Sequence, residues 1–303
     1  MNRNYYNEIK EELISCEVYK RVKDYSKNRK ELESYYNIGK ILIEAQGGED
    51  RAKYGNGLIK EYSIKLTEEI GKNYDTTTLK RTRQFYLLIQ KGAPLVHQMT
   101  WSHYIQLFKI NDINEINYYI NECINYSLSK RALEAKIKSK EYQRLDDKTK
   151  NKLIRKEEIT ITDFIKNPIV IKSNNKEIVN EKILKELILD NMNSFLKELG
   201  NGFAYIDNEY KIKIGNRYNY LDLLLFNYEF NAFVVVELKV TELKKEHIGQ
   251  IEVYMNYIDE NIKKINNDKT ICIIICKQDN NYVIKYCSDK RIISREYVIL
   301  WII

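Results

Sequence analysis

The 303-residue chain lacks several features that would assign it to a simple class of protein. It has no apolar run long enough to span a bilayer, and its first residues lack the apolar core of a signal peptide. Its five cysteines include no C-x-x-C pair and mostly lie in apolar segments, which predicts buried free thiols rather than disulfides or a zinc site. It also lacks a glycine-rich phosphate loop and internal repeats. We therefore expect a cytoplasmic protein with no membrane segment.

The chain is longer than one hydrophobic core usually requires, so two domains are expected. Composition places a helical domain at 1–150, a polar linker at 151–175 and a second domain at 176–303. Residues 1–150 carry 27 basic and 21 acidic side chains, whereas residues 151–303 carry 23 and 22, within a net charge of +7. The first half is the better candidate for electrostatic binding of a nucleic acid. Many proteins of similar charge bind none.

Apolar residues at helical spacing predict that the first half is almost entirely helical. A polar turn at 73–76 offers N-cap residues between a helix over 58–70 and a helix over 77–90. This pair is either a helix-turn-helix, whose second helix reads DNA through Lys80, Arg81 and Arg83, or an ordinary helical hairpin. A later helix that opens with Lys130 and Arg131 is either a second phosphate-facing helix or simply exposed.

The second half alternates between helical and strand patterns. We expect a long helix over 183–199 ended by Gly200, and a second helix over 245–265. Strands are predicted at 203–206, 211–214, 220–226, 233–240, 270–276, 282–286 and 297–303.

Two neighbouring strands of this half carry charged residues where a buried strand should have none. If 220–226 and 233–240 form a hairpin centred between Glu229 and Phe230, Asp222 lies opposite Glu237, and side-chain alternation puts Lys239 on the same face. Adjacent carboxylates repel unless a cation lies between them, and hard oxygen ligands suit Mg²⁺ or Mn²⁺. Lys239 would then hold or deprotonate a water, or neutralise charge on a phosphate. The alternative is a charged edge strand with a solvated face.

A series of motifs extends this pattern over nearly the whole chain. The motifs are Tyr36-x-Ile38-Gly39, Tyr54-Gly55, Leu79-x-x-x-Arg83-x-Phe85-Tyr86, Trp101-Ser102-His103-Tyr104, Phe195-Leu196-x-Glu198-Leu199-Gly200-x-Gly202-Phe203, Leu221-Asp222-Leu223, Glu237-Leu238-Lys239 and Gly249-Gln250-x-x-x-Tyr254. In this order they resemble the YhcG-like bacterial family. The resemblance implies an N-terminal all-α, helix-turn-helix-like domain, followed by an α/β PD-(D/E)XK restriction-endonuclease-like domain. Trp101 and His103 are expected to be structural.

The resemblance also implies a Mg²⁺- or Mn²⁺-dependent nuclease acting on DNA. Asp222 and Glu237 would bind the metal together with the backbone carbonyl of Leu238, and Lys239 would orient or activate the attacking water. Gln250, one helical turn before Tyr254, would contact this lysine or the DNA.

Many relatives add a glutamate from the first helix of this domain. Here Glu181 and Glu186 are the candidates. Two positions depart from the family pattern, because Lys185 stands where a glutamate is expected and Glu209 where relatives tend to carry glutamine.

Cutting both strands of a duplex often takes two active sites, so we expect a homodimer. Two other functions remain open. One is a catalytically silent DNA-binding or adaptor protein on a nuclease scaffold, and the other is an RNA nuclease. A purely structural role would leave the buried charges unexplained.

Overall fold

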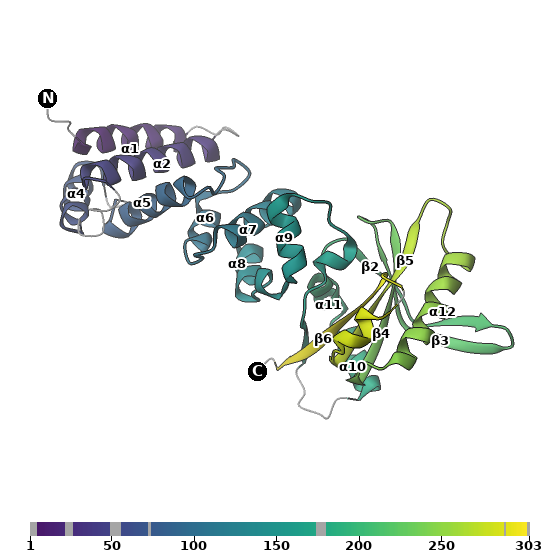
Figure 1. Cartoon of the computed structure of the whole chain (residues 1–303). Coiled ribbons are helices and arrows are strands. Elements are labelled where there is room, and N and C mark those ends of the chain that lie inside the picture. Colours follow the sequence, from purple (N-terminus) through teal and green to yellow (C-terminus); the bar gives the residue numbers. More distant parts are fainter. Residues whose placement is uncertain are drawn as a thin grey trace. The chain divides into compact units, whose positions relative to one another are not determined.

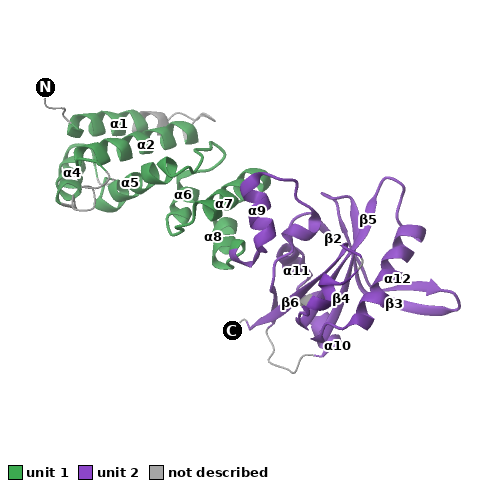
Figure 2. Cartoon of the chain, in the orientation of Figure 1, with its two compact units in different colours: residues 1–142 green, residues 143–303 purple. Residues whose placement is uncertain are grey.

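A computed structural model of the chain describes residues 5–21, 27–48, 56–71, 74–173, 180–287 and 289–301. Contacts divide the chain into two compact units, residues 1–142 and 143–303 (Figure 2). The Tyr54-Gly55 motif and the last two residues of the predicted C-terminal strand lie outside the described residues. Among the described helices, none combines the length and the apolar character needed to cross a membrane.

The described part of the first unit is helical, as predicted (Figure 1). Its helices are α1 (Tyr5–Arg21), α2 (Lys27–Ala45), α4 (Asn56–Glu69), α5 (Thr76–Gln90), α6 (Trp101–Leu107), α7 (Ile113–Tyr126) and α8 (Lys130–Lys138).

Polar side chains at the predicted turns begin several of these helices. The Asp75 carboxylate accepts a hydrogen bond from the Thr78 amide (2.7 Å), which caps α5. His103 Nδ1 accepts from the Thr100 amide (3.1 Å), and its Nε2 lies 2.9 Å from the Leu128 carbonyl oxygen. Both ring nitrogens of His103 are thus used within the fold, which confirms its predicted structural role.

A close helix crossing at Gly39 holds α5 against α2. A Cβ atom at Gly39 would lie 2.8 Å from the Tyr86 Cβ and closer still to the Thr82 carbonyl oxygen. The Tyr36 and Tyr86 rings meet nearby, with centroids 5.2 Å apart. The motifs around Gly39 and Tyr86 therefore describe one packing contact between two helices.

The second unit is an α/β domain (Figure 1). After a 3-10 turn, η1 (Tyr142–Arg144), its elements are α9 (Asp147–Arg155), η2 (Ile161–Phe164), β1 (Ile169–Ser173), α10 (Glu181–Asp190), α11 (Met192–Leu199), β2 (Phe203–Ile214), β3 (Arg217–Asn227), β4 (Ala232–Glu242), α12 (Lys245–Asn261), β5 (Asp268–Gln278), α13 (Asn281–Lys285) and β6 (Ile292–Trp301).

Six strands form one mixed sheet in the order β1-β6-β5-β4-β3-β2. The strands β2, β3 and β4 are antiparallel neighbours, whereas β4 with β5, β5 with β6 and β6 with β1 are parallel. Helices α10 and α11 pack on one face through Leu184, Ile188 and Phe195. Helix α12 packs on the other through Ile251 and Met255. Both faces of β4 are therefore buried, which explains its nearly continuous apolar sequence.

None of the five cysteines forms a disulfide within the described residues, and four of them are buried. Burial raises the pKa of the Cys276 thiol to about 12, which keeps it protonated and unreactive near neutral pH.

Several sequence predictions in this unit differ from the structure. The two strands predicted at 203–206 and 211–214 are one continuous strand, β2. The helix predicted over 183–199 is two helices, α10 and α11, which meet at Asn191. The strand predicted at 282–286 is helix α13, because Asn280 Oδ1 accepts from the amides of Tyr282 and Val283 and starts a helical turn. Strand β1 was not predicted, since β6, the strand with which it pairs, lies far along the chain.

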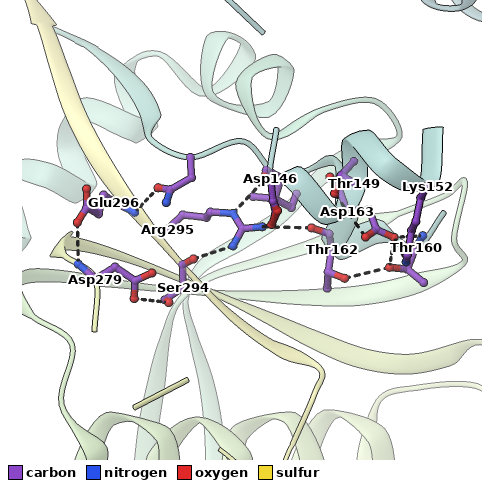
Figure 3. Close-up of polar contacts among 12 residues, drawn as sticks. Asp146, Thr149, Lys152, Thr160, Thr162, Asp163, Asp279, Ser294, Arg295 and Glu296 are labelled. Atoms are coloured by element: carbon purple, nitrogen blue, oxygen red, sulfur yellow. Dashed lines mark hydrogen bonds and ion pairs between the residues drawn. The ribbon is translucent and has the colours of Figure 1, made fainter. Parts of the chain in front are cut away.

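The predicted linker at 151–175 is ordered structure of the second unit wherever it is described. Arg295 on β6 anchors the segment that precedes β1 (Figure 3). Its Nε donates to the Ile165 carbonyl (2.8 Å) and its Nη2 to the Thr162 carbonyl (3.3 Å), while the Asp146 carboxylate lies 3.4 Å from Nη2. Polar composition alone suggested a linker, but this partly buried guanidinium satisfies two backbone carbonyls of the segment.

Replacing Gly39 with alanine should destabilise the first unit, because the added methyl group collides with the backbone of α5. We expect Gly39→Ala to lower the free energy of unfolding by about 1–3 kcal/mol, as measured by urea denaturation. Gly57→Ala is the control, since Gly57 lies in α4 with no neighbouring atom within 4 Å. That variant should be neutral or gain up to about 1 kcal/mol from helix propensity. Equal effects of the two changes would contradict the close crossing.

Replacing Arg295 with methionine should detach the segment around η2 from the sheet. The change keeps an apolar stem but leaves the Thr162 and Ile165 carbonyls without their donor. We expect a loss of about 2–4 kcal/mol in the free energy of unfolding and faster proteolysis between Asp146 and Ile165. Arg217→Met removes an exposed arginine of the same unit and should change stability by less than about 0.5 kcal/mol. An Arg295→Met protein as stable as this control would refute the anchoring role.

Candidate active site

The β3–β4 hairpin has the register predicted from sequence. Its pairs run from Leu223 opposite Val236 to Asn227 opposite Ala232, and Asp222 opposite Glu237 is the next step in the same register. The turn is fixed locally, because Asn227 Oδ1 accepts from the amides of Glu229 (3.0 Å) and Phe230 (3.2 Å).

The Glu237 carboxylate is buried on this central strand, with 4 % of the residue exposed. Its Oε1 accepts a hydrogen bond from Lys239 Nζ at 3.0 Å. Its Oε2 is buried without a hydrogen-bond partner among the residues that the structure describes. Burial, together with the nearby Asp222 charge, raises the pKa of Glu237 to about 7. An unpaired buried oxygen of this kind is expensive to maintain, which makes Glu237 a candidate functional residue.

Asp222 lies where β3 and β4 stop pairing as a regular ladder. Its Oδ2 accepts a hydrogen bond from the Leu238 amide at 2.9 Å, which fills the place of a ladder bond and holds the carboxylate beside Glu237. Its Oδ1 lies 3.0 Å from Lys185 Nζ on α10. Both oxygens of Asp222 thus have partners within the chain.

Lys239 completes the predicted trio. Burial lowers the pKa of its ammonium group, but the Glu237 carboxylate outweighs this, so the pKa is raised overall. Lys239 is therefore protonated near neutral pH. The structure brings Asp222, Glu237 and Lys239 together as the sequence predicted, with two carboxylates and one ammonium group on adjacent strands.

A second ammonium group, from Lys185, enters the same site. Its Nζ lies 3.0 Å from Asp222 Oδ1 and 3.1 Å from Glu209 Oε1. Burial lowers the pKa of Lys185, but the two carboxylates raise this pKa by more than burial lowers it. The pKa is therefore raised overall, and this lysine is also protonated near neutral pH. Both positions depart from the family pattern, but the sequence alone did not assign them to the site. The sequence signal that could have placed them in the site is that both positions differ from the family pattern at once, one with a cation and the other with an anion.

The two candidate acids of α10 occupy different places. Glu181, in the first turn, has its Oε1 4.0 Å from Lys239 Nζ. The Glu186 carboxylate lies 3.9 Å from Lys182 on the exposed side of the helix. His247, which sequence analysis did not select, lies near Lys239 and Glu181. Burial and the Lys239 charge lower the pKa of His247, so it is neutral near neutral pH.

Gln250 reaches Tyr254 rather than the acidic pair. Its Nε2 donates to the Tyr254 hydroxyl at 2.5 Å, and no hydrogen bond joins it to Asp222, Glu237 or Lys239 within the described residues. Tyr254 is buried against the sheet.

The basic residues proposed for the helical unit differ in exposure. Lys80, Lys130 and Arg131 are exposed, and Arg81 is partly exposed. Arg83 is partly buried and its Nη1 donates to Gln46 Oε1 at 3.2 Å.

The residues of the site fit a divalent cation of the Mg²⁺ type. The unpartnered Glu237 oxygen, the Asp222 carboxylate and nearby backbone oxygen are hard ligands. In the described residues, no group of three or more His, Cys, Asp or Glu side chains is placed to hold a metal. An ion here would therefore keep several positions for water or substrate oxygens, which is how Mg²⁺ is usually bound.

The fold and the acidic site are those of a PD-(D/E)XK nuclease-like domain. Residues 162–300 match the family model of the YhcG PDDEXK nuclease domain, and residues 14–144 match that of the DUF1016 N-terminal domain. The two matches together span most of the sequence, and the chain belongs to the YhcG-like family.

Three individual proteins are similar to the chain. "Putative nuclease YhcG" of Escherichia coli (strain K12) is 24% identical over 285 residues, which cover 81% of this chain and 76% of that protein. A repair endonuclease from Pyrococcus abyssi is 18% identical with a TM-score of 0.29, over 42% of this chain and 49% of its own. A structure of an EndoMS–dsDNA complex is 19% identical with a TM-score of 0.28, over 43% and 49%. The chain thus spans about half the length of these two solved structures.

The buried Glu237 charge should cost stability when no metal is present. We expect Glu237→Gln to raise the free energy of unfolding by about 1–3 kcal/mol in buffer with EDTA at pH 8, because a neutral amide of the same shape replaces an unsatisfied carboxylate. Denaturant titration would measure this change. Glu260→Gln, on the exposed side of α12, is the matched control and should have little effect. A destabilised Glu237→Gln protein would show that the carboxylate is a structural group.

Proposed function

We propose that the chain is a metal-dependent nuclease that hydrolyses phosphodiester bonds in DNA at Asp222, Glu237 and Lys239. The observation that carries the proposal is the Glu237 carboxylate, which is buried on a central strand with one oxygen unpartnered and the other bound to Lys239. Membership of a nuclease-domain family supports the same reaction.

The metal is the first requirement of this proposal. Glu237 Oε2, the Asp222 carboxylate and the backbone carbonyl of Leu238 would hold one Mg²⁺ or Mn²⁺ ion. When bound, the ion would supply a Lewis acid for hydrolysis. Its charge would also relieve the repulsion between the two carboxylates, which is one cause of the raised Glu237 pKa.

Lys239 would act as a donor rather than as a base. Its pKa is raised, so the ammonium group keeps its protons near neutral pH. It would donate one hydrogen bond that orients the attacking water, without taking a proton from that water. Alternatively, it would neutralise charge that develops on the phosphate. Glu237 Oε1, 3.0 Å away, fixes the position of this ammonium group.

The Lys185 ammonium group would supply positive charge in place of a second metal ion. Lys185 stands where relatives are expected to carry a glutamate, and its ammonium group lies on Asp222. A lysine at this place removes a ligand from any second metal and supplies a fixed positive charge beside the scissile phosphate. We therefore propose a site with one divalent ion.

The helical unit would bind and position the DNA. The cations that would contact the DNA are Lys80, Arg81, Lys130 and Arg131, which are exposed or partly exposed. Arg83 would not contact it, because its guanidinium is hydrogen-bonded to Gln46. Lys130 and Arg131 occupy the first turn of α8. Cations are unfavourable at this end of a helix dipole, so a phosphate partner would explain their presence.

The test is cleavage of supercoiled plasmid, linear duplex, branched DNA and single-stranded RNA with Mg²⁺ or Mn²⁺. We expect the wild-type protein to cut a DNA substrate. Asp222→Asn, Glu237→Gln and Lys239→Met should each lower the rate by a factor of about 100 or more, because each removes a group that acts on the reacting phosphate. Glu260→Gln should cut at the wild-type rate, which controls for protein quality.

Two outcomes would change the assignment. Cleavage of RNA alone would move the substrate class to RNA. Salt-sensitive binding of duplex DNA that survives all three site variants, with no cleavage by any protein, would identify a DNA-binding module on a nuclease scaffold.

A further inference from the structure

Strands β2 and β3 continue as a two-stranded ribbon beyond the rest of the sheet. The ladder between β3 and β4 begins at Leu223, whereas the pairs of β3 with β2 continue out to Arg217 opposite Ile214. The ribbon thus consists of residues 210–214 and 217–221. Figure 1 shows its hairpin end extending past the neighbouring strands.

One face of the ribbon belongs to the core. Ile212 and Leu221 are buried, and Tyr210 and Ile214 pack partly against the same cluster, which includes the apolar side of α12. This face explains how a ribbon with no third strand remains attached to the domain.

The other face carries lysines opposite tyrosines. Lys211 pairs with Tyr220 and Lys213 with Tyr218, so each of two successive rungs joins one lysine and one tyrosine. All four side chains are exposed, and the two tyrosines are each 54% exposed. An exposed tyrosine pair adds little to a hydrophobic core, so this face calls for a different explanation.

The two ammonium groups are positioned but not neutralised. Lys211 Nζ lies 3.9 Å from the centroid of the Tyr218 ring, and Lys213 Nζ lies 5.9 Å from the same centroid. Cation–π contact orders a lysine while leaving its hydrogen-bond donors open to a ligand. Within the part of the chain that the structure describes, neither lysine forms an ion pair.

This row leads directly to the candidate active site. Asp222 follows Tyr220 by two residues along β3, at the point where the strand changes faces, because Leu221 packs in the α12 cluster and Leu223 in the α10 cluster. At the Asp222 level, Lys185 Nζ contacts both Asp222 and Glu209, which lies between the paired residues of β2. The lysine–tyrosine rungs therefore end within two residues of the charged groups of the site.

We propose that Lys211, Lys213, Tyr218 and Tyr220 form a track for the DNA backbone next to the bond that is cut. The inference rests on the proposed function, because Asp222 marks the scissile phosphate. Rungs on one face are about 6.8 Å apart, and one strand of B-DNA carries a phosphate every ~3.4 Å of axis. Each lysine can thus take a different phosphate of one strand, while the tyrosine rings pack on the sugars.

The decisive experiment measures DNA binding without cleavage. Fluorescence anisotropy of a labelled duplex, in EDTA over a series of salt concentrations, gives the slope of log Kd against log salt for the full chain. We expect Lys211→Ala/Lys213→Ala to bind several-fold more weakly, with a slope smaller by about 1.8, since each lost phosphate contact removes about 0.9. Lys172→Ala/Lys197→Ala removes two exposed lysines on β1 and α11, at the opposite edge of the sheet, and should leave the slope unchanged.

The tyrosines need their own pair of variants, because a lysine effect alone could reflect general charge. Tyr220→Ala should weaken binding with little change of slope, and Tyr220→Phe should restore it, since the contact is made by the ring. Thermal unfolding of each variant at the wild-type temperature would show that the ribbon is intact.

Failure of this inference can be told apart from failure of the proposed function. If the wild-type protein cuts DNA and the ribbon variants bind with wild-type slope and affinity, the track is refuted and the nuclease stands. If no protein cuts DNA but Lys211→Ala/Lys213→Ala loses the slope, the track stands without the nuclease. A reduction that Lys172→Ala/Lys197→Ala reproduces would refute the track, because the effect would then depend only on net charge.

Discussion

A carboxylate on a central, doubly covered strand is the constraint on which this domain depends. Strand β4 lies between β3 and β5, and helices cover both of its faces. The Glu237 side chain on that strand has one oxygen bound to Lys239 and one without a partner. A rigid, well-packed sheet is needed to keep this oxygen without a hydrogen-bond partner. In a flexible sheet, a water molecule or a shifted backbone group would form a hydrogen bond with the oxygen. The long apolar runs of β3, β4 and β5 supply this rigidity.

Sequence could predict the parts of the fold and site that local rules decide. The register of β3 on β4 follows from a short turn between two apolar runs, and it placed Asp222, Glu237 and Lys239 together. Local rules did not predict the segments that are held by a strand or side chain far along the chain. Strand β1 pairs with the distant β6, and the segment before β1 has the composition of a linker although Arg295 satisfies its carbonyls. They also failed at α13, where one asparagine cap outweighed an apolar, β-branched stretch.

The lysine on α10 shows a different limit of sequence reasoning. Lys185 and Glu209 are each ordinary residues, and each alone would be counted as a lost feature of the family. The structure places them against one another and against Asp222, so the two departures are one change. A third carboxylate near Asp222 and Glu237 would demand another cation, whereas Lys185 brings that cation within the chain. The acidic pair is thereby partly neutralised before any ion binds.

The total charge of each half does not by itself say where a polyanion would bind, and the reason is physical. Only a cation that is free of carboxylates releases counterions from a phosphate at full effect. In the first unit, Lys136 is shared between Glu122 and Glu141, and Lys10 is paired with Glu69. In the second unit, which is almost neutral overall, Lys211 and Lys213 are held by an aromatic ring instead. The arrangement of pairs, rather than the sum of charges, determines which surface attracts a nucleic acid.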